Sequence, residues 1–327
     1  MICVIDRTLS CLDHFSPTPK QLLKLTGLLV EAAADWIELS ETAFLSMQTL
    51  PKGGKYILRL KTQENRSKYP MFERFVCREL SQSESGKQVT AEITMNSIHE
   101  SYTLAKYREY GLIRVRGMDD ILLENFDSAF GRLRKIFSGG IELCPTNRFG
   151  CASAIATEWA LADRGTSVVT SLCGIGGFAA FEEVVMALRY ARLRKVGKNY
   201  PMFPAIGRLM EEIPGIKIPG NKPILGNGIF AVESGIHVDG IVKQPKSYAP
   251  FPPEDIGQKH TIVLGKQSGK GSIIYKLQER NLRMTRDEIL RLLISVKKFS
   301  IKKNRAITDG EFVVLAEEVL AGRGCAT

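Results

Sequence analysis

Short β-rich runs alternate with amphipathic helical runs through the first two-thirds of this 327-residue chain, and this alternation limits the fold more than any other feature. Strands that are separated by helices usually lie parallel, so the pattern predicts a parallel sheet, either closed into a (β/α) barrel or doubly wound. The expected strands are Ile2–Asp6, Trp36–Ser40, Tyr56–Leu60, Val89–Met95, Leu112–Arg116, Gly140–Cys144 and Ser167–Cys173.

The helical runs fall between these strands and show apolar residues at helical spacing. Only about seven strands can be counted, whereas a TIM-type barrel has eight, so we expect an α/β fold with a (β/α) barrel shortened by one unit. The expected helices are Lys20–Ala34, Met71–Ser81, Tyr102–Tyr110, Asn125–Phe137, Ala152–Asp163 and Ala179–Lys195.

The pattern changes near residue 225, where Gly and Pro become frequent. These residues interrupt regular structure, and a short strand-like run and two helical runs follow them. We therefore expect two folding units, with residues 1–225 forming the barrel and residues 226–327 forming a linker and a small α-rich C-terminal subdomain. The length agrees with this division, because single domains rarely exceed about 250 residues.

Composition and charge narrow the class of protein. No apolar run approaches the roughly 20 residues that cross a membrane, and the first residues lack the pattern of a signal peptide, so we expect no membrane contact and a cytoplasmic location. The net charge of +10 suits an anionic ligand, such as a coenzyme A derivative or a polycarboxylate, or a nucleic acid. Nucleic acid is the less favoured partner, because the densest basic stretch, residues 297–305, continues an apolar helical pattern and is interpreted as a solvated helix face.

Three parts of the chain resemble the sequence signatures of one enzyme family. The longest is Asn221–Gly240 (NKPILGNGIFAVESGIHVDG) with Ile262–Gly269 (IVLGKQSG), and the others are Gly174–Leu188 and Val4–Leu9. On these segments the chain resembles the homocitrate synthase and 2-isopropylmalate synthase family over most of its length. The resemblance implies a (β/α) barrel. It also implies a condensation of the acetyl group of acetyl-CoA with a 2-oxo acid, in which a divalent metal ion at the barrel mouth acts as a Lewis acid.

The residues that hold this metal ion in the family are replaced here. The resemblance places Cys11, Cys144, Thr146 and Cys173 at the four ligand positions, and Ser10 at the position of an arginine that stabilises negative charge. The segment after Gly176, which the family associates with the acyl-CoA, is also shorter. We therefore expect that the condensation activity has been lost.

Cysteine at three of the four ligand positions predicts a thiolate site. The seven cysteines of the chain form no close-set pair, which favours buried thiols or metal ligands over disulfides in a reducing compartment. Cys11, Cys144 and Cys173 would converge from three strand ends and bind an iron-sulfur cluster, most simply a 4Fe–4S cluster with one open iron position. Zinc is the alternative. A decayed pocket, in which small cysteines only fill space, is the structural alternative.

Other residues near the strand ends are candidates for binding a small carboxylate ligand. They are Arg7, Glu38, Thr146, Asn147, Arg148 and His237. The last lies in the longest signature segment, which family members use near the partner's barrel mouth, so the resemblance also implies a homodimer.

Three functions remain open at this point. The first is an enzyme or sensor with a thiolate-bound metal centre, which if active would be a lyase or transferase of carboxylic acids. The second is an inactive homologue that works by association with another protein. The third is a conventional acyltransferase of the homocitrate or 2-isopropylmalate synthase type, which the missing groups make least favoured.

Overall fold

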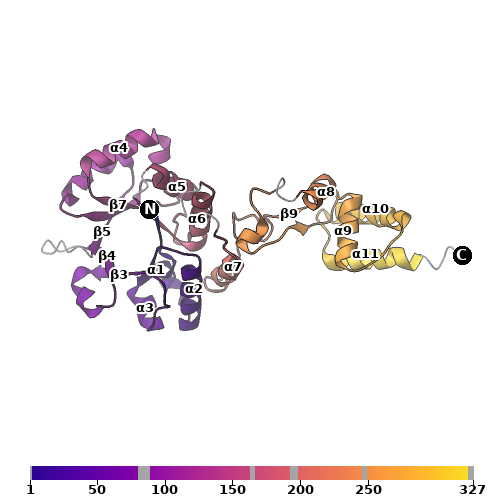
Figure 1. The fold of residues 1–327 in the computed structure, drawn as a ribbon, viewed down its shortest axis with the longest axis horizontal. Helices are drawn as coiled ribbons and strands as arrows, with labels where there is room; N and C mark the ends of the chain where they lie inside the picture. The colour runs from indigo at the N-terminus through magenta and orange to yellow at the C-terminus, as the bar shows by residue number, and fades with distance from the viewer. Residues whose placement is uncertain (1, 80–88, 163–165, 192–197, 245–248, 323–327) are drawn as a thin grey trace. The chain divides into compact units, whose positions relative to one another are not determined.

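The structure, a computed structural model, describes residues 2–79, 89–162, 166–191, 198–244 and 249–322. The chain forms two compact units (Figure 1). The first consists of Met1–Ile218 with Pro223–Leu225, and the second of Pro219–Lys222 with Gly226–Thr327. The chain passes between them within the Gly- and Pro-rich stretch of the sequence.

Eight parallel strands form a closed barrel in the first unit, which confirms the predicted fold class. Each strand pairs with the next one along the chain, and the eighth pairs with the first, with Cys3 opposite Ser167 and Asp6 opposite Thr170. The strands are β1 (Cys3–Asp6), β2 (Trp36–Ser40), β3 (Tyr56–Thr62), β4 (Arg74–Glu79), β5 (Val89–Met95), β6 (Leu112–Gly117), β7 (Gly140–Cys144) and β8 (Ser167–Thr170).

The expected shortening does not remove a strand. β4 lies within Met71–Ser81, and the predicted helix there is wrong. Phe72, Phe75 and Val76 have the spacing of a helix face, and an apolar run this short fits either type of structure. This segment forms a strand because it pairs with β3 and β5, and the pairing buries Phe75 and Val76 in the sheet.

The shortening is found in the connections instead. A 3₁₀ helix, η2 (Gln63–Lys68), joins β3 to β4, and another, η3 (Ile98–Tyr107), follows β5, where full α-helices cover a standard barrel. Parts of the expected helices Ala152–Asp163 and Ala179–Lys195 lie outside the described residues. The other connecting elements are α1 (Thr8–Cys11), η1 (Asp13–Phe15), α2 (Pro19–Glu31), α3 (Glu41–Met47), η4 (Ile121–Leu123), α4 (Phe126–Ile136), α5 (Ala152–Ala162), η5 (Leu172–Gly174), α6 (Phe181–Tyr190) and α7 (Phe203–Glu212).

The second unit is mainly helical and has its own apolar core. Ile273, Leu292, Val296 and Phe312 meet in this core from three successive helices. No helix in the described part of the chain is long and apolar enough to span a membrane. The elements are β9 (Ala231–Val232), α8 (Gly235–Lys243), η7 (Pro253–Ile256), β10 (Thr261–Ile262), α9 (Lys270–Glu279), α10 (Arg286–Lys303) and α11 (Asp309–Ala321).

The two parts of the longest signature, separated in sequence, pack against each other in this unit. The carboxylate of Glu233 accepts a hydrogen bond from the backbone N–H of Gln267 at 2.7 Å. A Cβ added at Gly235 would lie 2.7 Å from the Cα of Gly269. The glycines of the two motifs therefore allow a backbone-to-backbone contact that no side chain could enter.

Substituting Gly235 with alanine should destabilise the full chain by about 1–3 kcal/mol, because the new methyl group must push the Gly269 backbone away. Chemical denaturation followed by circular dichroism measures this change. Gly271→Ala is the matched control, since an added Cβ there has no neighbour within 4 Å and alanine favours the α9 helix. Equal stability of the two variants would contradict the packing explanation.

Candidate functional site

A cleft of about 420 Å³ opens at the end of the barrel where the strands have their carboxyl termini. The functional residues of (β/α) barrels lie at this end, on the loops that follow the strands. Among the residues that the structure describes, two arginines and no carboxylate line the cleft. The lining residues are Thr94, Asn96, Arg116, Gly117, Thr146, Asn147, Arg148, Gly176 and Gly177.

A tight turn at the end of β6 places a carboxylate under this cleft. A Cβ added at Gly117 would lie 2.2 Å from the carbonyl oxygen of Met95, and φ at Gly117 is +112°, so the turn requires glycine. Met118 follows with φ of +56°. The turn buries the side chain of Asp119, which is 2% exposed.

Asp119 fixes two of the predicted ligand-binding residues. Its carboxylate accepts hydrogen bonds from the Thr146 hydroxyl at 2.6 Å and from Nε of Arg148 at 2.6 Å, and the second bond raises the pKa of Arg148. The side-chain oxygen of Asn147 accepts the backbone N–H of Ala152, the first residue of α5, at 3.0 Å. The structure therefore brings Thr146, Asn147 and Arg148 to the cleft, but each makes a hydrogen bond that shapes the cleft wall.

Arg116, near the end of β6, lines the same cleft. Its Nε is buried and has no hydrogen-bond partner among the described residues, and its Cζ lies 5.4 Å from the centroid of the Phe178 ring. Sequence reasoning missed this residue. A signal was present, because Arg114 and Arg116 alternate in an otherwise apolar strand, and alternate residues share one face of a strand.

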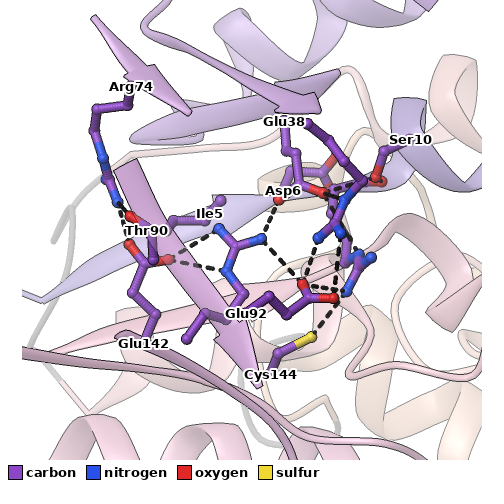
Figure 2. Close-up of polar contacts among 12 residues, drawn as sticks. Ile5, Asp6, Ser10, Glu38, Arg74, Thr90, Glu92, Glu142 and Cys144 are labelled. Atoms are coloured by element: carbon purple, nitrogen blue, oxygen red, sulfur yellow. Dashed lines mark hydrogen bonds and ion pairs between the residues drawn. The ribbon is translucent and has the colours of Figure 1, made fainter. Parts of the chain in front are cut away.

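Buried ion pairs fill the barrel interior (Figure 2). Arg114, which is wholly buried, donates from Nη1 to Glu38 and from Nε to Oε2 of Glu142 at 2.9 Å. Arg59 donates from Nε to Oε1 of Glu38 at 2.7 Å and pairs with Glu92. Glu38, which was predicted to bind the ligand, is thus enclosed by guanidinium groups and is 0% exposed.

These guanidinium groups keep the buried carboxylates ionised. Burial by itself raises the pKa of Glu38, but Arg114 and Arg59 hold that pKa well below its usual range. Burial also raises the pKa of Glu92, but neighbouring guanidinium groups, Arg59 first among them, lower this pKa to about 2. Both groups are therefore negatively charged at neutral pH.

Arg7, the residue after β1, reaches into the same interior and contacts a thiol. Its Nη1 donates to Sγ of Cys144 at 3.2 Å and lies 3.6 Å from Oε2 of Glu92. Its Cζ lies 4.2 Å from the centroid of the Phe178 ring, and the residue is 4% exposed. Arg7 was predicted to bind the ligand, and in this structure its contacts are with groups of the barrel itself.

Two of the three predicted metal-binding cysteines lie in one place. Cys11 packs against the apolar cluster that contains Cys144. Burial raises the pKa of the Cys11 thiol to about 11 and also raises that of Cys144, although the charge of Arg7 opposes both shifts. Without a bound metal ion the neutral thiols are therefore favoured at neutral pH, and a metal ion or cluster would have to displace their protons.

Cys173 lies in η5, where its φ is +58° and its backbone N–H donates to Oε2 of Glu182 at 3.0 Å. Among the residues that the structure describes, no group of three or more His, Cys, Asp or Glu side chains is arranged to hold a metal ion. Metal binding by Cys11, Cys144 and Cys173 stays a prediction.

His237 is the predicted site residue that lies outside the barrel. It is exposed on α8 of the second unit. The neighbouring Ile236 is 78% exposed. The signature segment thus presents a titratable and an apolar side chain at the surface of its own unit.

Replacing Arg114 with methionine should destabilise the protein by about 3–5 kcal/mol, because Glu38 and Glu142 would lose a buried partner. The free energy of unfolding of the full chain measures this loss. Arg78→Met is the control: Arg78 pairs with Glu92 at 3.1 Å, but its side chain is 57% exposed, so we expect a change below about 1 kcal/mol. A small effect at Arg114 would show that the ion pairs do not support the barrel.

Comparison with known proteins agrees with the resemblance seen in the sequence. Residues 224–304 match the family model described as homocitrate synthase post-HMGL domain-like. This segment contains residues 224–240 of the first part of the longest signature, all of its second part and most of the second unit. The match therefore covers most of the unit outside the barrel, and one curated relative extends the likeness to 89% of the chain.

Three curated relatives illustrate this likeness. The homocitrate synthase omega subunit of Clostridium pasteurianum is 26% identical over 89% of this chain and 88% of its own length. Homocitrate synthase AksA of Methanothermobacter thermautotrophicus is 38% identical over 64% of this chain and 52% of its own length. 2-Isopropylmalate synthase 2 of Caldanaerobacter subterraneus is 38% identical over 55% of this chain and 47% of its own length. The chain thus spans nearly all of the first relative and about half of the other two.

Proposed function

We propose that this chain, which belongs to the homocitrate synthase and 2-isopropylmalate synthase family, binds a small carboxylate anion in the cleft at its barrel mouth and does not perform the acetyl-CoA condensation. The observation that carries the proposal is Arg116. Its guanidinium group lines the cleft, and its buried Nε has no hydrogen-bond partner among the described residues.

A carboxylate suits this cleft on three grounds. The fork of a guanidinium group matches a carboxylate and can bind it with two parallel hydrogen bonds. The second arginine of the lining, Arg148, adds positive charge, although Asp119 partly offsets it. A volume of about 420 Å³ fits a small ligand.

The loss of condensation is proposed from the groups around the barrel interior. The family's catalytic arginine position carries Ser10, whose hydroxyl donates to Oε1 of Glu38 at 2.9 Å. The thiols of Cys11 and Cys144 have raised pKa values through burial, and Arg7 stands beside Cys144. Ser10, Cys11 and Cys144 therefore offer neither an arginine nor the carboxylate and imidazole groups that hold a hard divalent ion as a Lewis acid in the family.

Arg116→Gln should weaken the binding of citrate or 2-oxoglutarate by roughly 10- to 100-fold, the value of a hydrogen bond to a charged group. Isothermal titration calorimetry measures the affinity. Arg132→Gln is the control, because Arg132 pairs with Glu124 on the barrel surface and lies outside the cleft.

A separate assay tests the loss of condensation. Incubation of the protein with acetyl-CoA and either 2-oxoglutarate or 2-oxoisovalerate should release no free coenzyme A. Equal affinities of the two variants contradict the site, and released coenzyme A contradicts the loss of activity.

An iron-sulfur cluster on Cys11, Cys144 and Cys173, with zinc as its alternative, is the rival proposal for the same barrel. Its support is the shared location of Cys11 and Cys144. It requires Cys173 to join them as a third ligand and both buried thiols to ionise. Metal content and the visible spectrum of protein purified without oxygen decide between the two proposals.

Association through the second unit is a further part of the proposed function. One relative that matches most of this chain is named as a subunit of homocitrate synthase, and the exposed Ile236 stands beside His237 in the signature segment. We propose a homodimer in which this segment contacts the partner. Pairing with a different chain is the alternative.

Sedimentation velocity at micromolar concentration should give the mass of a dimer. Ile236→Asp should shift the protein to the monomer, because a charge would replace a buried apolar contact. Ile301→Asp, at a 65% exposed position on α10, should leave the dimer intact. A wild-type monomer, or an equal effect of both substitutions, would contradict this interface.

A further inference from the structure

The two arginines that line the cleft at the barrel mouth have different electrostatic surroundings. Arg116 lies in register with Thr94 on β5 and with Cys144 on β7, and neither of these neighbours is a carboxylate. The Nε of Arg116 is buried and has no hydrogen-bond partner in the described part of the chain. The positive charge of Arg116 is therefore directed to the cleft without an acidic neighbour in its own layer of the barrel.

Arg148, in contrast, lies among carboxylates. Its Nε is 2.6 Å from Oδ2 of Asp119. The pKa of Arg148 is raised first by Asp119, and the charges of Asp120 and Glu100 add to this shift. Asp120 and Glu100 are fixed in place, since each accepts a backbone N–H of the loop after β5 at 3.0 Å. Three carboxylates thus act on one guanidinium group at this end of the cleft.

This difference determines where a ligand can place negative charge. A guanidinium group that is already paired with a carboxylate attracts a second anion weakly, because the two opposite charges largely cancel. Asp119 has the strongest effect, since it contacts Arg148 directly and is only 2% exposed, so that water screens its charge poorly. A carboxylate of the ligand next to Arg148 would be repelled, whereas an amide or a hydroxyl group would not.

We propose that Asp119 makes the cleft selective for ligands with a single carboxylate. That carboxylate binds to Arg116, and the part of the ligand next to Arg148 is polar and uncharged. The threonine and asparagine side chains of the cleft lining suit such a polar group. Asp119 acts through Arg148 and does not touch the ligand. This inference rests on the proposed carboxylate site and names the class of its ligand.

Succinate and succinamate are matched probes, because they have the same length and differ only in the replacement of one carboxylate by an amide. Isothermal titration calorimetry of the full chain, at one low ionic strength, measures both affinities. The wild-type protein should bind succinamate roughly fivefold more tightly, the effect of one like charge about 5 Å away in a largely aqueous surrounding.

Asp119→Asn should abolish this preference by strengthening the binding of succinate and leaving that of succinamate within about twofold. Asparagine keeps an oxygen that can accept the hydrogen bonds of Thr146, and it removes the charge. A structural defect would weaken the binding of both ligands, so the ratio of the two affinities separates the effect of charge from the effect of folding.

Two further variants complete the comparison. Glu158→Gln is the control, because it removes an exposed carboxylate from α5 that does not line the cleft, and it should keep the wild-type preference. Arg148→Gln should enlarge the preference for succinamate at least twofold, since Asp119 and its acidic neighbours lose their counter-charge. If Arg148 instead bound a second carboxylate of the ligand, this variant would lose affinity for succinate in a protein that had preferred it.

Each outcome has one consequence. Tighter binding of succinate than of succinamate by the wild-type protein overturns the proposal, as do equal affinities or an unchanged preference in a folded Asp119→Asn variant. If Asp119→Asn does not fold, Arg148→Gln replaces it: a larger preference for succinamate supports the proposal, and an unchanged or smaller one overturns it. Failure of the wild-type protein to bind either probe or 2-oxoglutarate refutes the carboxylate site itself, whereas binding without the preference refutes only the selectivity.

Discussion

The ion pairs inside the barrel are the interaction on which the rest of the structure depends. Inward-facing side chains of (β/α) barrels are commonly bulky and apolar, whereas six successive strands here place charged side chains in the interior: Glu38, Arg59, Arg74, Glu92, Arg114 and Glu142. A buried charge without a partner is strongly unfavourable. Since each group finds its partners on other strands, closure of the barrel and satisfaction of the charges require each other.

The same charges link the interior to the mouth. Arg7 pairs with carboxylates of the interior, and Arg116 lies one layer above Arg114 on the same face of β6. Phe178 lies in contact with both Arg7 and Arg116. The guanidinium group of Arg7 is therefore paired with carboxylates of the protein itself. The guanidinium group of Arg116 lines the cleft, where a ligand could reach it. This difference, rather than the number of basic residues, makes the cleft a candidate site.

Packing contacts within the second unit account for the resemblance of its sequence to the family. Glu233, Gly235 and Gly269 make contacts between two segments that are distant in the chain. These contacts stabilise a fold and require no ligand. Retention of this signature therefore supports family membership and says little about chemistry, which depends on the residues at the barrel mouth.

The sequence by itself determined a parallel α/β fold, because strand–helix alternation follows from local patterns, and the family resemblance favoured a closed barrel over a doubly wound sheet. It also identified the region of the mouth through residues such as Thr146 and Arg148. It could not determine whether residues 74–79 form a strand, since that run fits a helix until its neighbours are in place. It also could not show that Arg7 contacts the thiol of Cys144. Ligand positions can be aligned from sequence, but the contacts of their side chains form across the barrel. Only the tertiary structure showed that Arg7 reaches the thiol of Cys144, whereas Arg116 lines the cleft at the mouth.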